Sequence, residues 1–210
     1  MDILRQARSC PEVRSFIEDA TLVVADGMPL VWASRLARNP LPERVTGSSL
    51  IWSLSAGLAA DARSVFVLGG DTPDIAERAA DRLADSFPGL AVAGHRSPPF
   101  GFDADPEAVD EAVTAVADAA PNLVFVGIGF PRQERLIGRL RAVLPDTWFL
   151  GCGMAVNFVA GHQVRAPRWM QRAGLEWAHR LTAEPRRMAR RYLRHDAPYA
   201  IRLLANATRR

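Results

Sequence analysis

The sequence predicts an α/β fold of the Rossmann-like type, with a mostly parallel sheet covered by helices on both faces and a basic helical appendage at the C-terminus. Apolar runs without alternation, such as residues 64–68 and 123–127, are separated by stretches of helical length. Residues 168–210 have helical composition, many arginines and no strand signal. The composition is that of a globular protein, with 49% hydrophobic and 23% charged residues among 210. We therefore predict a Rossmann-like domain over residues 1–167 and an Arg-rich appendage over residues 168–210.

The N-terminal part is expected to alternate between helices and a strand. Residues 11–19 have helical composition, and the apolar run at residues 21–24 is long enough for a buried strand. A second helix is predicted over residues 29–38, before a Pro-rich turn. Another helix begins after Thr46, a candidate N-cap, and ends near Ala60.

From residue 64 onward the predicted strands and helices alternate regularly. The predicted strands cover residues 64–68, 90–93, 123–127 and 147–150. The predicted helices cover residues 74–87, 106–119 and 129–143. Such alternation favours a parallel sheet, in which ligands bind beyond the carboxyl ends of the strands. Two or three further helices are expected in the appendage.

All 26 basic residues are arginines, and they are distributed unevenly along the chain. Residues 165–210 hold 12 arginines and three acidic residues, a net charge of +9, whereas residues 1–164 carry a net charge of −6. A basic tail on an acidic body implies a polyanionic partner. Diphosphates, anionic lipid headgroups and nucleic acid all have this chemistry, and we favour a lipid diphosphate over nucleic acid.

Several classes of protein and site find no support in the sequence. The N-terminus has no apolar signal segment and no stretch reaches the ~20 apolar residues of a membrane span, so we expect a cytoplasmic chain. Cys10 and Cys152 stand apart and are expected to be free buried thiols. The four histidines lack the spacing of a zinc helix, and neither a GxGxxG fingerprint nor a P-loop occurs. We expect no metal and no cofactor.

The residues that follow the predicted strands are the candidates for a ligand site. Asp26 follows the first predicted strand and can act as a general base if partial burial raises its pKa. The competing interpretation is an N-cap for the next helix. Glycine-rich turns let backbone amides approach a phosphate, although turn geometry alone explains such glycines equally well. These turns are Gly69-Gly70-Asp71, Gly127-Ile128-Gly129 and Gly151-Cys152-Gly153.

The segment Asp103-Ala104-Asp105 has the DxD spacing with which many sugar transferases hold a metal-bound diphosphate. It lies directly before Pro106 and a predicted helix, where Asp105 suits an N-cap. We favour the N-cap over the metal site.

Four segments carry a family pattern that spans nearly the whole chain in order. They are ADGMPLVW at 25–32, PERVTG at 42–47, GIGFPRQE at 127–134, and a C-terminal set with RAPRWM at 165–170, LEW at 175–177 and EPRR at 184–187. The chain thereby resembles the WecG/TagA/CpsF family of bacterial glycosyltransferases (glycosyltransferase family 26). The three C-terminal blocks are highly specific in combination.

The resemblance implies an inverting, metal-independent transferase. It would move an N-acetylmannosamine-type or related hexose from a UDP-sugar to a sugar on a membrane polyprenyl diphosphate, in cell-surface polysaccharide or teichoic acid biosynthesis. Asp26 would be the general base, and Arg44 and Gln133 polar active-site residues. The candidate substrate-binding residues combine positions that follow the predicted strands with arginines of the tail that resemble the family's appendage. They are Gly69, Gly70, Gly129, Pro131, Gly153 and Asn157, and Arg187, Arg190, Arg191 and Arg194. The tail arginines would dock at the inner face of the cell membrane and help to close the site over the diphosphate. A homo-oligomer is compatible with the sequence.

Two departures from the family pattern stand out. The family begins with a strand that ends in Thr-x-Asn, and Met1 stands where that strand would end. We expect the strand to be missing from this sequence through a misassigned start. Asn157 stands where the family has Asp, so donor choice can differ, because Asn donates a hydrogen bond where Asp only accepts. The alternative hypothesis is a catalytically impaired member that binds nucleotide or lipid as an assembly module.

Overall fold

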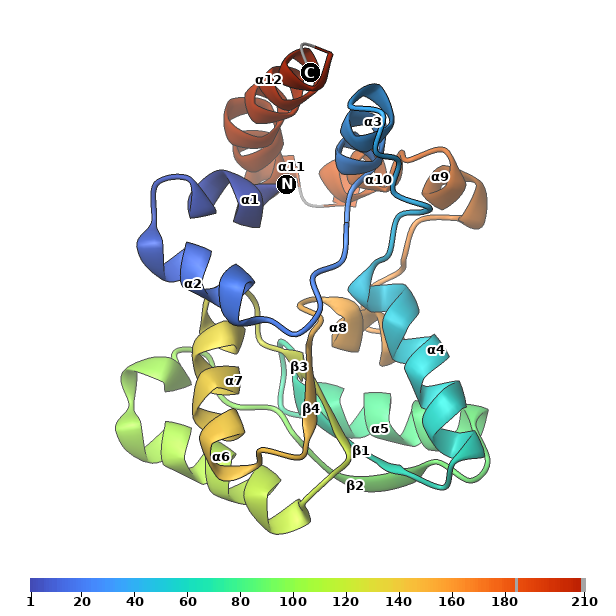
Figure 1. Ribbon diagram of the computed structural model, residues 1–210. Coiled ribbons are helices and arrows are strands. Elements are labelled where there is room, and N and C mark those ends of the chain that lie inside the picture. The colour runs from blue at the N-terminus through green and yellow to red at the C-terminus, as the bar shows by residue number, and fades with distance from the viewer. Residues whose placement is uncertain (184, 209–210) are drawn as a thin grey trace. The chain divides into compact units, whose positions relative to one another are not determined.

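The chain folds into two compact units, which are described separately. Unit 1 comprises residues Met1–Thr46 and Arg165–Arg210, and unit 2 comprises residues Gly47–Val164. The computed structural model describes residues 1–183 and 185–208, apart from the side chains of Arg172, Arg187, Arg190 and Arg191. Figure 1 follows the chain by colour and labels its elements. The division into domains 1–167 and 168–210 stays a prediction.

Unit 2 is built on a four-stranded parallel sheet, as predicted. Its strands run in the order β2-β1-β3-β4. Their bounds are β1 (Ser64–Gly69), β2 (Ala91–Arg96), β3 (Leu123–Gly127) and β4 (Trp148–Gly151). Because β1 and β3 lie in the middle with both faces covered, their apolar runs show no alternation. In the register of this pair Val65 lies beside Leu123, and all pairings within the sheet are parallel.

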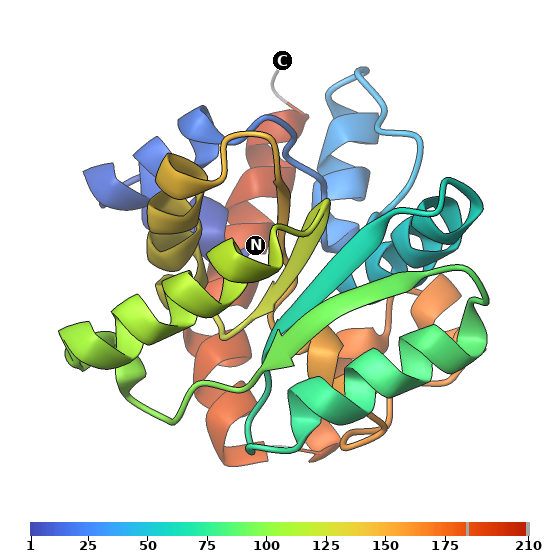
Figure 2. The same ribbon diagram turned by 90° about the horizontal axis from the view of Figure 1, so that it is seen from below.

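Helices cover both faces of this sheet, as Figure 2 shows from below. One core cluster joins inward-facing residues such as Phe125 to α4 (Gly47–Ala60), α5 (Ile75–Ser86) and α8 (Ala155–Val159). The other joins residues such as Val124 to α6 (Pro106–Ala119) and α7 (Arg132–Val143). Neighbouring residues of β3 thus point to opposite faces, as the period of a strand requires. Asp105 caps α6 through a hydrogen bond of 3.0 Å from the Glu107 N–H, which confirms the N-cap prediction.

All regular secondary structure in the described residues of unit 1 is helical. The tail is helical, as predicted, and its last helix α12 packs against α3, while α1 packs against α2. The helices are α1 (Asp2–Ala7), α2 (Pro11–Asp19), α3 (Met28–Leu36), α9 (Arg168–Arg172), α10 (Glu176–Ala183), α11 (Pro185–Ala189), a π-helical segment (Arg190–Asp196) and α12 (Ala197–Ala207).

The strand predicted at residues 21–24 is wrong. This segment is an irregular connection between α2 and α3, and Leu22 and Val23 are 75% and 59% exposed. A buried strand needs neighbours on both sides, and the whole described sheet belongs to unit 2. Among the backbone hydrogen bonds that the structure describes, the connection between α2 and α3 makes one to another segment. In that bond the Val45 N–H donates to the Ala25 carbonyl oxygen at 3.0 Å. Asp26 therefore does not follow a strand.

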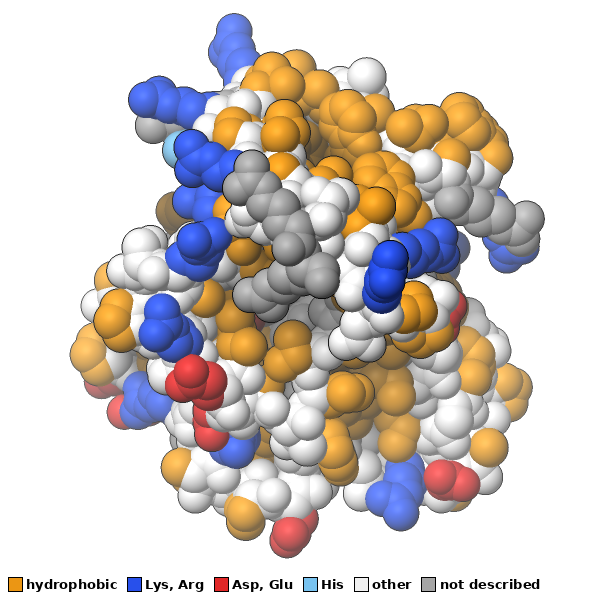
Figure 3. All heavy atoms as spheres, turned by 45° about the horizontal axis from the view of Figure 1, so that its top comes forward, with side chains coloured by type: hydrophobic (Ala, Val, Ile, Leu, Met, Phe, Trp, Pro, Cys, Tyr) orange, Lys and Arg blue, Asp and Glu red, His pale blue; other side chains and the backbone are white. Residues whose placement is uncertain are grey.

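Apolar side chains lie at the surface of unit 1. Trp169 is 64% exposed, Leu193 64% and Ile201 68%. Figure 3 shows hydrophobic side chains gathered over α12 and α3 with basic side chains beside them. None of the helices in residues 1–183 and 185–208 is both long enough and apolar enough to cross a bilayer.

Candidate active site

Asp26 is the titratable group of unit 1 whose surroundings favour proton transfer. Solvent reaches the carboxyl, yet protein atoms crowd around it, and this desolvation raises its pKa above the ordinary value. The positive charge of Arg44 opposes the shift and the negative charge of Glu176 adds to it. The N-cap position of α3 is occupied by Gly27, so Asp26 is not the N-cap of that helix. The arrangement is suited to a general base.

The sequence positions Arg44 near Asp26 through one backbone contact. The hydrogen bond from the Val45 N–H to the Ala25 carbonyl oxygen ties the segments that carry the two side chains. The structure thus brings together two of the three predicted catalytic residues, Asp26 and Arg44, within unit 1.

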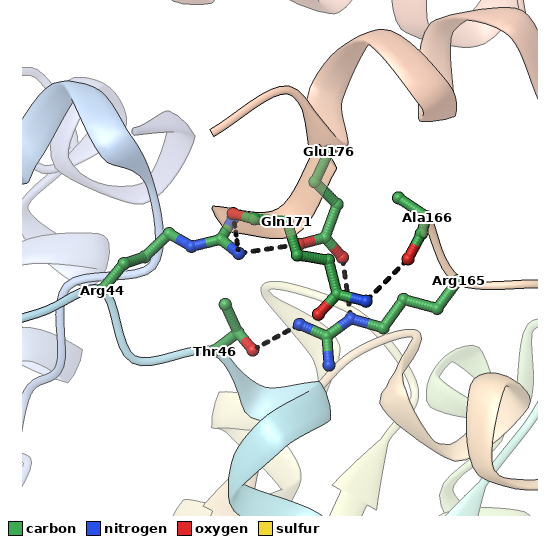
Figure 4. Close-up of polar contacts among 6 residues, drawn as sticks. All are labelled: Arg44, Thr46, Arg165, Ala166, Gln171 and Glu176. Carbon is green, nitrogen blue, oxygen red and sulfur yellow. Dashed lines mark hydrogen bonds and ion pairs between the residues drawn. The ribbon is translucent and has the colours of Figure 1, made fainter. Parts of the chain in front are cut away.

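Arg44 is held by the start of the C-terminal segment, as Figure 4 shows. Its Nη2 donates to Glu176 Oε2 at 3.0 Å and to the Gln171 carbonyl oxygen at 3.3 Å. Glu176 Oε1 accepts from Arg165 Nε at 3.0 Å, and Arg165 Nη2 donates to the Thr46 hydroxyl at 3.1 Å. We call Arg44, Glu176, Arg165 and Thr46 the Glu176 network.

Glu176 is ionised in this network over a wide pH range. Burial alone would raise its pKa, but the hydrogen bonds and charges of Arg165 and Arg44 outweigh burial, so the pKa lies below its ordinary value. Sequence reasoning assigned Glu176 no role. The available signal was that it is the one acidic residue between positions 165 and 183, among several arginines.

In unit 2 the predicted glycines lie where backbones meet at the carboxyl edge of the sheet. Gly69 has φ +134°, and an added Cβ would collide with the carbonyl of Gly127 on the neighbouring strand. An added Cβ at Gly127 would lie 2.8 Å from the Gly153 carbonyl oxygen. The Gly70 N–H donates to the Gly127 oxygen at 3.2 Å. The ends of β1, β3 and β4 are therefore locked together by close backbone contacts that a side chain would prevent.

Gln133 is buried at the same edge with a fixed amide orientation. Its Nε2 donates to Glu134 Oε1 at 2.8 Å, and its Oε1 accepts from the Gly153 N–H at 3.2 Å. Desolvation raises the pKa of Glu134, whose Oε2 is buried without a hydrogen-bond partner in the described part of the chain. Gln133 thus links the start of α7 to the turn after β4.

Asn157 is fully buried and holds the turn after β1. Its Oδ1 accepts from the Asp71 N–H at 3.2 Å, and its Nδ2 donates to Asp71 Oδ2 at 2.7 Å. The structure thus gathers Gly69, Gly70, Gln133, Gly153 and Asn157 at the carboxyl edge of the sheet of unit 2. Asp71 lies among these residues, and the sequence analysis placed it in the turn after the two glycines without assigning it a role.

Gly129 and Pro131 belong to the same edge of the sheet, because they lie in the turn between β3 and α7 and the Gln133 N–H donates to the Gly129 carbonyl oxygen at 3.0 Å. Arg194 lies apart from them, exposed on the π-helical segment of unit 1. The side chains of Arg187, Arg190 and Arg191 lie outside the described part of the structure, so their predicted contacts stay predictions.

Unit 1 also contains a basic cavity. Its volume is about 580 Å³, and its lining residues come from α1 and α12: Arg5, Arg8, Tyr199, Arg202, Ala205 and Asn206. Arg8 and Arg202 make no ion pair with any residue that the structure describes. Such a cavity suits an anionic ligand.

The chemistry of the remaining candidates is limited. Cys10 and Cys152 are free and half-buried, and burial raises the pKa of the Cys152 thiol to about 12, so it stays protonated. Among the residues described, no group of three or more His, Cys, Asp or Glu side chains is arranged to hold a metal ion. Asp105 is occupied as an N-cap, and Asp103 lies 3.9 Å from Arg132.

Comparison with known proteins assigns the chain to a family. The model of the glycosyl transferase WecG/TagA/CpsF family matches residues 1–210. The chain belongs to this family. The resemblance inferred from the sequence motifs is thereby confirmed.

Two curated members of the WecG/TagA/CpsF family show how similar the chain is to its relatives. A protein of Bacillus spizizenii is 31% identical over 185 residues, which cover 88% of this chain and 69% of the relative. A protein of Bacillus subtilis is 30% identical over 174 residues, which cover 83% of this chain and 65% of the relative. Both are named N-acetylglucosaminyldiphosphoundecaprenol N-acetyl-beta-D-mannosaminyltransferase. The chain thus spans about two thirds of each relative's length.

Proposed function

We propose that the protein is an inverting glycosyltransferase with a UDP-sugar donor and a polyprenyl-diphosphate-linked sugar as acceptor. The sugar transferred is of the N-acetylmannosamine type or a related hexose. The product belongs to cell-surface polysaccharide or teichoic acid biosynthesis. The names of the two Bacillus relatives support the acceptor class and the sugar.

The observation that carries this proposal is the crowded carboxyl of Asp26 beside Arg44. A base for glycosyl transfer must be ionised before the reaction and must accept a proton during it. Desolvation raises the proton affinity of Asp26, while the positive charge of Arg44 keeps the carboxylate from being protonated too readily. The Glu176 network fixes Arg44 in this role.

The reaction then follows from the proton's path. Asp26 accepts the proton of an acceptor hydroxyl as its oxygen attacks the anomeric carbon of the donor sugar. The bond from that carbon to the UDP oxygen breaks, and UDP leaves with the electron pair. Because the attack and the departure occur on opposite faces in one displacement, the configuration at the anomeric carbon is inverted.

We propose that arginines, rather than a metal ion, stabilise the charge that develops on the diphosphate. Guanidinium groups bind phosphate oxygens through paired hydrogen bonds. Arg44 and the arginines of positions 186–194 are the candidates. In unit 2 the turns at the carboxyl edge of the sheet are the candidates for nucleotide binding, because ligands of open parallel sheets bind there.

The acceptor's lipid requires access to a membrane surface. Unit 1 combines exposed apolar side chains with Arg8 and Arg202, which make no ion pair with the residues that the structure describes, and this is the chemistry expected of a peripheral protein on anionic lipid. We propose attachment of this kind at the inner face of the cell membrane.

The test is a transfer assay with a panel of UDP-sugars and a polyprenyl-diphosphate N-acetylglucosamine acceptor, in a chelator. NMR of the product reports the anomeric configuration. Transfer from UDP-N-acetylmannosamine with inversion is the expected result. Loss of activity in chelator, restored by magnesium or manganese, would contradict the metal-independent mechanism. UDP binding without transfer to any acceptor would instead favour an impaired member that serves as a binding module.

A further inference from the structure

Asp71 is an exposed carboxylate that the sequence motifs did not single out. It follows Gly69 and Gly70 at the carboxyl end of β1. In the strand order β2-β1-β3-β4, β2 is added on one side of β1, whereas β3 and β4 are added on the other side, so the strand order switches between β1 and β3. This switch point is where open parallel sheets bind their ligands. Asp71 is therefore placed where a ligand of unit 2 is expected.

The buried amide of Asn157 holds Asp71 by two hydrogen bonds. One runs from the Asp71 N–H to Asn157 Oδ1 and the other from Asn157 Nδ2 to Asp71 Oδ2, at 3.2 and 2.7 Å. Asn157 is 1% exposed and its Nδ2 also lies 3.3 Å from Met154 Sδ. Because the buried Asn157 amide both accepts from and donates to Asp71, it fixes the orientation of the Asp71 backbone and carboxylate.

The turn that carries Asp71 is rigid. An added Cβ at Gly70 would lie 2.5 Å from Ile75 Cβ, so the turn packs directly on the start of α5. The Ser97 hydroxyl donates to the Gly69 carbonyl oxygen at 2.9 Å and accepts from the Ala76 N–H at 3.0 Å. A carboxylate on such a turn is preorganised before any ligand binds.

Asp71 Oδ1 makes no hydrogen bond with any residue that the structure describes. One carboxylate oxygen of this exposed residue is thus anchored, and the other has its hydrogen-bonding capacity left over. An ionised carboxylate only accepts hydrogen bonds, so its partner must be a donor. A carboxylate also repels phosphate, so the complementary donors of a sugar nucleotide are its hydroxyl groups and the N–H groups of the uracil and of the acetamido substituent. Hydroxyl groups are the most numerous of these donors, and neighbouring pairs of them occur on both the ribose and the hexose.

We propose that Asp71, held by Asn157, binds a sugar hydroxyl of the donor nucleotide. This proposal rests on the UDP-sugar donor proposed above. The hydroxyl belongs either to the ribose or to the transferred hexose, since both present neighbouring hydroxyls. The pairing also explains why position 157 holds Asn. An Asp there would place a second carboxylate against that of Asp71, with no hydrogen-bond donor between the two.

The experiment measures nucleotide binding by calorimetry and thermal stability in the same samples. The probes are UDP, 2′-deoxy-UDP and UDP-N-acetylmannosamine. The variants are Asp71→Asn, Asn157→Asp and both exchanges together, with Asp81→Asn as a matched control that removes an exposed carboxylate from α5.

Asn157→Asp should lower the Tm, and the double exchange should restore it, because an amide again faces a carboxylate. Asp71→Asn and the double exchange should both bind the nucleotide roughly 10- to 100-fold more weakly, the effect of one hydrogen bond to a charged group. If the ribose is bound, the wild type prefers UDP over 2′-deoxy-UDP and Asp71→Asn abolishes the preference. If the hexose is bound, only the preference for UDP-N-acetylmannosamine over UDP disappears.

If Asp71→Asn binds all three probes with wild-type affinity, the contact between Asp71 and Asn157 is purely structural. This result would overturn the inference about Asp71 but leave the proposed donor standing. Recovery of both stability and affinity in the double exchange would do the same. A wild-type protein that binds none of the three probes would overturn both this inference and the proposed donor.

Discussion

The two units of the chain use opposite strategies to hold themselves together. In unit 2 apolar side chains are sealed between sheet and helices, and Phe125 and Val124 are 0% exposed. Unit 1 has a smaller buried core, which includes Val31, and 12 of the 17 large apolar side chains that are exposed in the described residues belong to it, among them Ile201 at 68% and Trp169 at 64%. A polar network joins distant parts of unit 1 instead, linking Arg44 to Glu176.

This difference indicates that unit 2 serves as a rigid scaffold and unit 1 as a contact surface. A sealed parallel sheet gives the turns of unit 2 a rigid base, which is what nucleotide binding needs. An exposed apolar surface is costly in water unless it meets another phase or molecule, and arginines beside it suit an anionic partner. We interpret unit 1 as the part of the chain that carries the proton-accepting residue and meets the lipid.

Apolar truncation provides the strongest test of the comparison. Phe125→Ala should cost about 3–5 kcal/mol of stability, because it leaves a cavity between sheet and helices. Ile201→Ser should change stability by less than about 0.5 kcal/mol, because its side chain is already in water. Urea denaturation measures both. A large loss for Ile201→Ser would mean that this surface is packed in solution.

Glu176→Gln tests the polar network of unit 1. It should cost about 1–3 kcal/mol, because Arg44 and Arg165 both lose a charged acceptor. The lowered pKa of Glu176 means that its contribution is present above its ordinary value of 4.5 and is lost as the pH falls through the lower folded value. The wild type and the variant should therefore converge in acid.

Glu111→Gln is the matched control for Glu176→Gln, since it removes an exposed carboxylate that pairs with Arg96 in unit 2. It should cost no more than about 1 kcal/mol. Equal losses for the two variants at neutral pH would show that the Glu176 network does not stabilise unit 1.

Charge removal on the tail gives the smallest expected effect. Arg194→Gln and Arg202→Gln remove two exposed charges from unit 1. Each should weaken binding to anionic liposomes by about 1 kcal/mol, so the pair should weaken it about 30-fold. The control removes Arg78 and Arg139 of unit 2, which pair with Asp74 and Asp110. An equal loss in the control would mean that total charge, rather than this surface, governs binding.

The sequence predicted the elements of unit 2 well because each depends on its own local pattern. The strand at residues 123–127 and the helix at residues 106–119 have the predicted bounds, since an unbroken apolar run and a Pro-bounded amphipathic stretch each have one interpretation. The same rule failed at residues 21–24. A run of four residues rich in apolar side chains specifies a strand only where a neighbouring strand exists, and the sequence does not show the neighbour.

The candidate site was predicted in part. Family motifs pointed to Asp26, Arg44 and Gln133, which stay predictions as catalytic residues. Glu176 and Asp71 were assigned no role, because their significance lies in partners 132 and 86 positions away. A pairing of that kind has no local pattern.

The most direct test of the account is the turnover of Asp26→Asn. The amide keeps the size of the side chain but cannot accept the proton, so kcat should fall by roughly 10²- to 10⁴-fold while UDP affinity and stability stay near wild type. Glu18→Gln, an exposed carboxylate on α2 of the same unit, controls for the loss of charge and should leave kcat unchanged. Near-normal turnover of Asp26→Asn with a polyprenyl-diphosphate acceptor would contradict the account and remove Asp26 from the mechanism.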